Sequence, residues 1–339
     1  MAAVISGIGT ALPPYSYTQA EVLDVIQYKR NVFRSLFLNS GIEKRHACLE
    51  HGFRPPNDAN WFAAYYEEWA RKLAVLAARQ ALEKAKATAD EIEHIIVASC
   101  TGYLCPGLSQ LLARELGLGA FAKNSNLLGM GCSAMIPALN RAHDHVVAKG
   151  SGKVLVIAVE ICSAAYWYDE NDLESAVGNA IFADGASAVV VEGRAPRAGE
   201  RELCSFASFT DRELLYHMGF YNQDGRLRVR LSRDVPEAVG PLIDSVVEQL
   251  SPRKSEVDHW IVHPGGRRIL EVVGSRFGLS DRLGPSWSVL SQCGNMSSAT
   301  LLFVLNELER TAAPRAGETG MMIGIGPGLT CEGALIRWS

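Results

Sequence analysis

Apolar positions follow two different spacings along the first half of the chain. The runs "EHIIVAS", "KVLVIAV" and "ASAVVVE", at residues 93–99, 153–159 and 186–192, are short and rich in β-branched residues, which is typical of buried strands. In contrast, "WFAAYYEEWARKLAVLAARQALEKA" (61–85) places its apolar residues at helical spacing. Strands and helices therefore alternate, and the pattern predicts an α/β protein.

The second half of the chain repeats the order of the first. The segment "DEIEHIIVAS" (90–99) is similar to "SEVDHWIVHP" (255–264), and "GCSAMIPALNRAHDHVV" (131–147) is similar to "GNMSSATLLFVLNELER" (294–310). The offsets are 165 and 163 residues, and two matches in the same order indicate a duplicated α/β unit. We place the halves at 1–195 and 196–339, divided within the loose segment "EGRAPRAGERE" (192–202). In this alignment Cys132 lies opposite Asn295.

Composition and charge narrow the class of protein. A chain of 339 residues is long enough for about two structural units. The net charge of -4 and the absence of a basic block argue against a nucleic-acid partner. The N-terminus has no basic segment before its apolar residues, and no run approaches 18 apolar residues, so we expect a cytoplasmic protein without a membrane span. The eight scattered cysteines are then expected to be reduced thiols.

Three residues at predicted strand and helix ends are candidates for chemistry. Cys132 follows Gly131 at the start of a predicted helix, where the helix dipole would lower the pKa of the thiol; a packed, inert thiol is the other interpretation. His263 ends a short apolar strand in "WIVHPGG", where ligands gather in open α/β sheets. Asn295 opens the matching helix of the second half, where it could also be an N-cap. If the halves pack about a pseudo-twofold axis, all three side chains meet at the centre.

Longer motifs surround these residues in a fixed order. They are "CTGYLCPGL" (100–108), "GMGCSA" (129–134), "VGNAIFADGASAVVVEG" (177–193), "HWIVHPGG" (259–266), "VLSQCGNMSSAT" (289–300) and "GIGPGLTCEG" (324–333). With this set the chain resembles, over essentially its whole length, the type III polyketide synthases, which include chalcone synthase. The segment "MGF…DGRLRVRLSRDVPE" is more similar to the bacterial members than to the plant ones.

The resemblance implies a fold and a reaction. The fold is thiolase-like, with two α/β halves in five layers, α-β-α-β-α. Cys132, paired as a thiolate with the His263 imidazolium, would attack an acyl-CoA starter and hold it as a thioester. His263 and Asn295 would stabilise the enolate that forms when malonyl-CoA loses CO₂. Repeated extension and ring closure would give a pyrone, resorcinol or phloroglucinol type product. Acyl-CoA and malonyl-CoA are substrates, so neither a cofactor nor a metal is expected.

Further positions follow from their place in these motifs. Phe182, in "AIFADG", matches the aromatic residue between the CoA tunnel and the cavity. Cys105, in "TGYLCPGL", matches the residue whose side chain crosses a dimer interface into the partner's cavity, so the resemblance implies a homodimer. The other substrate-binding positions implied are Thr101, Ala165, Gly225, Val229 and Ser297. Small side chains at three of them, Ala165, Gly225 and Ser297, predict room for a sizeable starter.

The sequence also departs from the family pattern. The basic residues that would hold the CoA phosphates are matched, out of step by a residue or more, by Lys29, Arg30 and Arg34. These three could instead form a solvated helix face. Met135 and Ile136 replace small residues behind the nucleophile, which predicts a reshaped cavity floor. Arg267 and Arg268 stand where the family is commonly neutral or singly basic.

Other interpretations of the same residues agree less well with the sequence. A β-ketoacyl-ACP synthase III would share the fold and the three candidates, but its "HQAN" around the histidine is replaced here by "HPGG". A catalytically silent scaffold of the same fold would not need all three residues. A dinucleotide site at "GIGTAL" (7–12) lacks the third glycine. Cys100 with Cys105, and His259 with His263, fit no common spacing for a structural zinc site.

Overall fold

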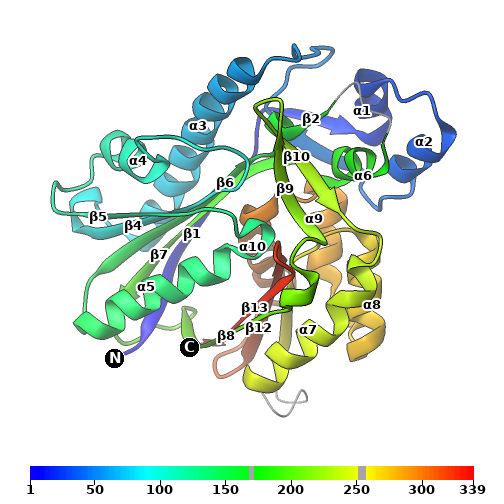
Figure 1. Cartoon of the computed structure of the whole chain (residues 1–339). Coiled ribbons are helices and arrows are strands. Elements are labelled where there is room, and N and C mark those ends of the chain that lie inside the picture. The colour runs from blue at the N-terminus through cyan, green and yellow to red at the C-terminus, as the bar shows by residue number, and fades with distance from the viewer. Residues whose placement is uncertain (168–171, 251–256) are drawn as a thin grey trace.

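One nine-stranded mixed sheet runs through both halves of the molecule (Figure 1). The computed structural model describes residues 1–167, 172–250 and 257–339. The strand order is β11-β12-β13-β8-β1-β7-β6-β4-β5. The strands are β1 (Ala3–Ala11), β4 (Ile92–Ala98), β5 (Lys123–Leu127), β6 (Lys153–Ile161), β7 (Asp184–Gly193), β8 (Arg201–Thr210), β11 (His259–Val262), β12 (Thr319–Gly326) and β13 (Thr330–Trp338).

The two halves of this sheet have the same topology. In the first half β1 pairs antiparallel with β7, β7 antiparallel with β6, and β6 parallel with β4. In the second half β8, β13, β12 and β11 follow in the same order and orientation. The halves join where β1 pairs with β8 through three residue pairs, from Ala3 with Leu203 to Ile5 with Arg201. The duplication predicted from the sequence is therefore confirmed, although Ser255 and Glu256 of the repeat lie outside the described residues.

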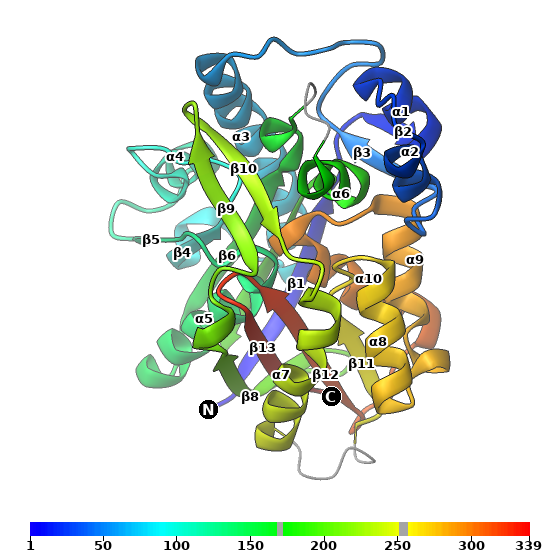
Figure 2. The same cartoon turned by 45° about the vertical axis from the view of Figure 1, so that its right-hand side comes forward.

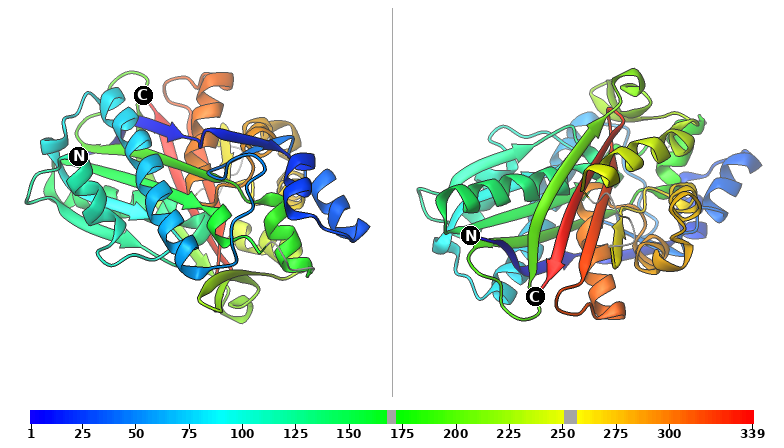
Figure 3. Two further views of the ribbon diagram at one scale, coloured as in Figure 1. Left: turned by 90° about the horizontal axis from the view of Figure 1, so that it is seen from above. Right: turned by 90° about the horizontal axis from the view of Figure 1, so that it is seen from below.

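Helices complete a five-layer arrangement. The helices are α3 (Ala59–Ala85), α4 (Leu108–Leu116), α5 (Met135–Lys149), α7 (Val235–Leu250), α8 (Arg267–Phe277), α9 (Gly284–Cys293) and α10 (Thr300–Ala312). α3 and α4 cover the outer face of the first half, and α7 covers that of the second half and packs against α8 (Figure 3). α5 and α10 contact strands of both halves, so they form the central layer. Three apolar cores fill the spaces between these layers, which confirms the predicted α-β-α-β-α order.

Smaller elements gather at one end of the sheet (Figure 2). They are the strands β2 (Tyr15–Thr18), β3 (Lys44–Ala47), β9 (Met218–Gln223) and β10 (Arg226–Leu231), and the helices α1 (Gln19–Ile26), α2 (Asn31–Leu38) and α6 (Leu173–Ile181). Short 3-10 turns link several elements: η1 (Ala89–Glu91), η2 (Gly131–Ser133), η3 (Cys162–Ala165), η4 (Arg212–Leu214), η6 (Ser280–Arg282) and η7 (Ser297–Ala299). η2 lies against β12 and η7 against β6, so each turn packs on a strand of the other half.

The apolar spacing predicted four regular elements of the first half, one helix and three strands. The helix expected at 61–85 is α3, which begins two residues earlier because the Asp58 side chain accepts a hydrogen bond from the Trp61 N–H and caps it. The strands expected at 93–99, 153–159 and 186–192 correspond to β4, β6 and β7. The boundary between 195 and 196 falls in the connection from β7 to β8 and stays a prediction. Among the described helices, none is both long and apolar enough to cross a membrane.

Candidate active site

Cys132 lies in the η2 turn that leads into α5. Gly131, the first residue of the turn, has a φ of 50°, and a Cβ there would lie 2.6 Å from Pro327 Cδ. Glycine satisfies both constraints, so it fixes the direction of the next side chain. The buried Cys132 thiol has two possible acceptors for its one hydrogen, Asn295 Oδ1 at 3.8 Å and Ser297 Oγ at 3.6 Å. The nucleophile candidate of the first half thus contacts the turn region of the second half.

His263 directly follows β11 and is fully buried. Its backbone N–H donates to Ile323 O at 2.8 Å, which holds the residue beside β12. Among the described residues, neither Nδ1 nor Nε2 has a hydrogen-bond partner. Burial lowers the pKa of His263 to about 3, so the imidazole is neutral, with one nitrogen able to accept a proton and the other able to donate. Buried polar atoms are rarely left unpaired, so this ring is available to a ligand.

Asn295 lies in the loop before η7 and is held by its backbone. It forms a parallel bridge with Phe182, which ties the loop to the end of α6. Its Oδ1 accepts from the Ser297 N–H at 2.8 Å, and its Nδ2 donates to Gly265 O at 3.1 Å. This network assigns the orientation of the amide. The second hydrogen on Nδ2 remains for a ligand.

The structure corrects the alignment of the two helix starts. Ser297 opens η7 with a φ of 48°, as Gly131 opens η2 with a φ of 50°. One residue further, Cys132 corresponds to Ser298, and Asn295 lies three residues before that position. The sequence alignment matched Gly131 with Gly294, but in the second half three more residues separate the glycine from the turn. The prediction that Asn295 occupies the place of Cys132 is therefore wrong, although all three candidates meet as expected.

Burial dominates the electrostatics of Cys132 and His263. It raises the pKa of Cys132 to about 11, and the hydrogen bonds of the thiol with Ser297 and Asn295 oppose this only partly. The prediction that the helix start lowers the pKa of Cys132 is therefore wrong for the chain without a ligand. Each shift reflects the cost of one isolated buried charge. Moving the thiol proton to the imidazole would instead create two opposite charges that attract one another.

One cavity of about 440 Å³ contains all three candidates. Its inner end is formed by the buried Cys132, His263 and Asn295, and its wall is mostly apolar. Four of the other predicted substrate-binding residues line it: Thr101, Phe182, Val229 and Ser297. Within the described chain, no group of His, Cys, Asp or Glu side chains could hold a metal ion.

The position of Phe182 is fixed by hydrogen bonds to its backbone carbonyl. Its carbonyl accepts hydrogen bonds from Arg45 Nη1 and from Tyr166 Oη, both at 2.6 Å. Arg45 is 1% exposed, so this is a buried guanidinium that supports the cavity wall. The sequence analysis did not assign Arg45, and only its place in the basic segment before "HACLE" could have drawn attention to it.

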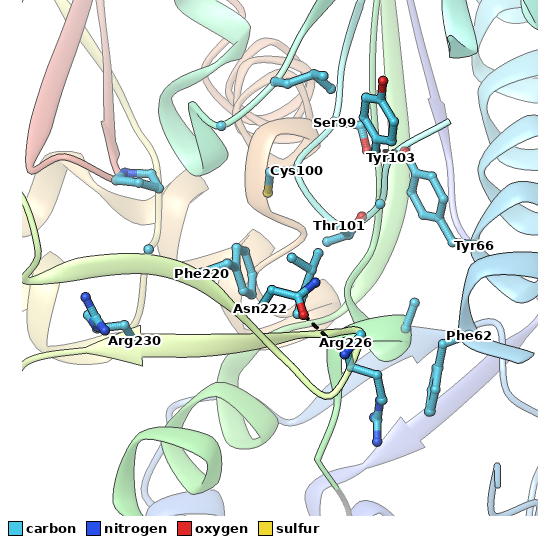
Figure 4. A pocket seen from close by; sticks show the side chains of 18 of the residues that line it. Phe62, Tyr66, Ser99, Cys100, Thr101, Tyr103, Phe220, Asn222, Arg226 and Arg230 are labelled. Atoms are coloured by element: carbon cyan, nitrogen blue, oxygen red, sulfur yellow. Dashed lines mark hydrogen bonds between the residues drawn. The ribbon is translucent and has the colours of Figure 1, made fainter. Parts of the chain in front are cut away.

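A second cavity of about 740 Å³ adjoins the first, and both are lined by Cys100, Thr101 and Phe220 (Figure 4). Gly225 lines this second cavity, in the tight turn between β9 and β10. With a φ of 75° there and 51° at Asp224, the turn requires residues that tolerate a left-handed backbone. The glycine is thus explained by the turn and not by the space that it leaves. Ala165 lines neither cavity, whereas its neighbour Ala164 lines the second.

A buried carboxylate at the end of β6 was missed by the sequence analysis. Glu160 Oε2 accepts from Thr101 Oγ1 at 2.9 Å and from the Cys100 N–H at 3.0 Å, and Oε1 accepts from Ser298 Oγ at 2.5 Å. Burial raises the pKa of Glu160, although these donors oppose the shift. Its negative charge also raises the pKa of Cys132. A single Glu that ends the apolar run "VLVIAVE" was the signal that could have identified it.

The residues at which the sequence departs from the family pattern lie in different parts of the structure. Lys29, Arg30 and Arg34 are exposed around the start of α2, and none of them lines either cavity. Arg267 and Arg268 line the cavity of Cys132 at its exposed end. Met135 and Ile136 are fully buried in the central core and do not line the cavity, so they do not form its floor.

Cys105 lies apart from the catalytic cavity of its own chain. It is exposed and lines a smaller cavity with Tyr103 and Leu104, and this cavity shares Tyr103 with the second cavity. This position leaves the thiol at the surface, next to Tyr103, which is 74% exposed. The predicted contact of Cys105 with a partner's cavity stays a prediction.

Comparisons with known proteins identify the family. Residues 63–196 match the N-terminal domain, and residues 218–338 the C-terminal domain, of the chalcone and stilbene synthases. The chain is 35% identical to the 3,5-dihydroxyphenylacetyl-CoA synthase of Amycolatopsis balhimycina, over 98% of this chain and 92% of that protein. It is 30% identical to the 1,3,6,8-tetrahydroxynaphthalene synthase of Streptomyces peucetius, over 98% and 93% of the two chains.

Solved structures agree with this assignment. The 1,3,6,8-tetrahydroxynaphthalene synthase of Streptomyces coelicolor, a bacterial type III polyketide synthase, matches with a TM-score of 0.91 and 26% identity, over 100% of this chain and 99% of that one. PKS-I of the brown alga Ectocarpus siliculosus matches with a TM-score of 0.92 and 28% identity, over 100% and 98%. These relatives do not support the β-ketoacyl-ACP synthase III alternative. The thiolase-like chain therefore belongs to the chalcone and stilbene synthase family and is a type III polyketide synthase, an acyltransferase.

Proposed function

We propose that this polyketide synthase condenses malonyl-CoA with an acyl group carried on Cys132. One observation carries the proposal: Cys132, His263 and Asn295, from the two halves of the chain, meet at the buried end of one mostly apolar cavity. Members of the family use acyl-CoA and malonyl-CoA as substrates. The proposed steps require no resident cofactor, because both carbon sources arrive as activated thioesters.

Loading begins with transfer of the Cys132 proton to a free ring nitrogen of His263. The sulfur then bonds to the acyl carbon of the starter, and the bond from that carbon to the CoA sulfur breaks. The leaving CoA thiolate takes the proton back from His263 and departs as the free thiol. The buried, unpaired imidazole suits this role, because no other hydrogen bond among the described residues competes for its nitrogens.

Extension uses His263 again, now together with Asn295 and on a different substrate. Malonyl-CoA loses CO₂ when its carboxyl C–C bond breaks, and the electron pair remains as an enolate. His263 and the free hydrogen on Asn295 Nδ2 would donate to the enolate oxygen, and each well-placed donor of this kind stabilises a transition state by about 3 kcal/mol. The enolate carbon attacks the acyl carbon on Cys132, which frees the thiolate and leaves a longer β-ketoacyl chain on CoA. That thioester can then reload Cys132.

The product is proposed to be a pyrone, resorcinol or phloroglucinol type ring. Two relatives are named for hydroxylated aromatic products, 3,5-dihydroxyphenylacetyl-CoA and 1,3,6,8-tetrahydroxynaphthalene. Cavities of about 440 and 740 Å³ share lining residues, so a chain that grows at Cys132 has adjoining space to enter. This space supports a sizeable starter, even though Gly225 is explained by its turn.

We further propose a cytoplasmic homodimer in which Cys105 lies near the partner's cavity. Cys105 and the exposed Tyr103 support this, because both are at the surface near the wall formed by Cys100 and Thr101. Light scattering of the purified protein would give its mass in solution. A monomer at working concentration would contradict the dimer without affecting the chemistry proposed for Cys132.

The decisive experiment combines the purified protein with malonyl-CoA and a panel of short, long and aromatic acyl-CoA starters, with products identified by mass. We expect products longer than the starter by several ketide units. Activity with only the shortest starters would contradict the sizeable cavity. Activity with malonyl-acyl-carrier protein but with no CoA thioester would overturn the proposed function.

A further inference from the structure

Charged residues along the wall of the catalytic cavity are all of one sign. Among the described residues that line it, four are arginines, and none is Asp, Glu or Lys. These residues are Arg230, Arg233, Arg267 and Arg268. The inner end is buried and mostly apolar, whereas Arg233, Arg267 and Arg268 are exposed. The cavity thus runs from a neutral interior to a positive mouth.

Two of these arginines begin α8. Arg267 and Arg268 follow Gly266, the N-cap, and the first N–H groups of such a helix have no acceptor within it. The partial positive charge of the helix start adds to the guanidinium charges, and such a site favours phosphate. The Arg267 stem lies against Gly41, since a Cβ on Gly41 would be 3.5 Å from Arg267 Cβ. The mouth is therefore enclosed between α8 and the connection from α2 to β3.

Acidic partners only partly neutralise this group. Glu271 lies 2.8 Å from Arg267 Nε and 3.7 Å from Arg268 Nη1, and Glu237 lies 3.4 Å from Arg268 Nη2. The Arg267 and Arg268 side chains stay 53% and 64% exposed, so their forked N–H groups remain accessible to solvent. Neither Glu271 nor Glu237 lines the cavity.

The other two arginines differ from each other. Within the described chain, Arg233 makes no ion pair and is exposed at the mouth. Arg230 lines both cavities, and its guanidinium lies 5.2 Å from the centre of the Tyr221 ring and 5.9 Å from that of Tyr216. Arg230 therefore belongs to the wall, and Arg233 completes the charged group at the entrance.

We propose that Arg233, Arg267 and Arg268 bind the phosphate groups of CoA thioesters, in place of the basic residues on and before α2. This inference rests on the proposed use of CoA thioesters at Cys132. The acyl end enters the apolar interior, while the pyrophosphate and 3′-phosphate remain at the arginine mouth, where charge-assisted bidentate hydrogen bonds can form. Lys29, Arg30 and Arg34 line neither cavity, whereas Arg233, Arg267 and Arg268 line the cavity of Cys132.

The test is a calorimetric titration of the full chain with CoA, 3′-dephospho-CoA and pantetheine. The R267A/R268A variant is expected to bind CoA about tenfold or more weakly, because hydrogen bonds between charged groups are worth about 1.5–3 kcal/mol. Pantetheine has no phosphate, so its affinity should not change. R233A should show a smaller loss for CoA. In turnover, KM for malonyl-CoA should rise, while KM for the N-acetylcysteamine thioester of malonate should stay constant.

Arg310→Ala is the matched control. Arg310 is 69% exposed and pairs with Glu307 of its own helix, as Arg267 pairs with Glu271, but it does not line the cavity. Its replacement should change CoA affinity by less than about twofold. Unchanged CoA binding by R267A/R268A, or equal losses for CoA and pantetheine, would overturn the proposal. A K29A/R34A variant that loses CoA affinity while R267A/R268A keeps it would do the same.

The two proposals fail in different ways. If the wild-type chain binds CoA through these arginines but forms no ketide product, the proposed function is wrong and the phosphate site stands. If it forms ketide products with an unchanged KM for malonyl-CoA in R267A/R268A, the phosphate site is wrong and the proposed function stands. A wild-type chain that binds no CoA at any concentration tested would overturn both.

Discussion

The two 3-10 turns at the centre of the molecule begin with similar backbone conformations but carry different side chains. η2 starts at Gly131 with a φ of 50°, and η7 starts at Ser297 with a φ of 48°. At the next position the first turn carries the Cys132 thiol, and the second carries the Ser298 hydroxyl, which donates to Glu160. The two turns thus have similar geometry, but only η2 carries a thiol nucleophile. The second copy supplies support, and its catalytic candidate, Asn295, lies in the preceding loop.

The first residue of each turn shows the same asymmetry. Glycine adopts a positive φ without strain, whereas a non-glycine residue there costs of the order of 1–3 kcal/mol. Ser297 is held in this conformation with its Oγ 3.6 Å from Cys132 Sγ and 3.5 Å from Cys100 Sγ. A strained residue that contacts the reacting thiol indicates that its side chain is used, whereas Gly131 is required for space.

The largest effect is expected from Cys132→Ala, which removes the one thiol carried by the two turns. Acyl transfer from the starter to the protein should fall below detection, because alanine has no sulfur with which to form the thioester. Intact-protein mass spectrometry after incubation with an acyl-CoA measures it. Cys204→Ala is the control, since Cys204 lies on β8 and lines neither cavity. An acyl adduct of equal yield on Cys132→Ala would refute the assignment.

His263→Ala tests whether the thiol depends on a base from the other half. Burial, together with the nearby charge of Glu160, raises the pKa of Cys132 to about 11, so without an acceptor the thiolate should form only as the pH rises toward that value. Alkylation of Cys132 by iodoacetamide near neutral pH should therefore slow by about tenfold or more.

The matched control for this experiment is His259→Ala. His259 lies at the start of β11 and pairs with Glu318 at 2.7 Å, away from the cavity. Its variant should keep the wild-type pH profile of alkylation. Identical profiles for wild type and His263→Ala would mean that the imidazole does not accept the thiol proton.

Gly131→Ala should lower the free energy of unfolding by about 3 kcal/mol, because it combines a left-handed backbone with a clash. The added Cβ would lie 2.6 Å from Pro327 Cδ. Gly129→Ala separates the two causes, since its φ is 75° but a Cβ there meets nothing within 4 Å; it should lose only about 1 kcal/mol. Urea denaturation compares the two, and equal losses would show that the contact with Pro327 has no effect.

Ser298→Ala should have a smaller effect that depends on pH. It removes a donor to the buried Glu160 carboxylate, a loss of about 1–3 kcal/mol in the free energy of unfolding when that group is ionised. Burial raises the pKa of Glu160 in the folded chain, so at low pH the carboxyl is protonated and needs the donor less. The loss should therefore grow as the pH rises through this raised pKa.

Ser187→Ala controls for the removal of a buried hydroxyl. Ser187 Oγ donates to the neutral carbonyl of Ala299 at 2.9 Å, so its loss should not vary with pH. Denaturation curves at several pH values give both series. Parallel, pH-independent losses would show that Ser298 does not act through the charge of Glu160.

Four regular elements of the first half could be predicted because their residues repeat with the period of one structure. α3 keeps apolar residues on one face over 27 residues, and β4, β6 and β7 are apolar on both faces, as strands buried between helices must be. Cys132 and His263 could be predicted for a related reason, since both lie at an element end within two residues of a glycine. Such ends can be read from local sequence.

Features that depend on contacts between distant segments could not be predicted. The three-residue shift between Asn295 and the true counterpart of Cys132 arises from a loop held by its bridge to Phe182, which no local pattern shows. Exposed arginines cannot be told apart in the sequence, and only the fold shows that Arg267 lines the cavity and that Arg34 does not. Burial likewise reversed the pKa shift that was expected at the start of α5.

β1 has neighbours in both halves, since it pairs along its length with β7 and through three residue pairs with β8. The site lies between these halves, so we expect the chain to melt in one cooperative transition that includes the site. A ligand that binds only the folded chain at about 100 times its Kd adds about 2.7 kcal/mol to the stability of the whole. A thermal-shift screen of CoA thioesters could therefore rank starters by affinity before any product is identified.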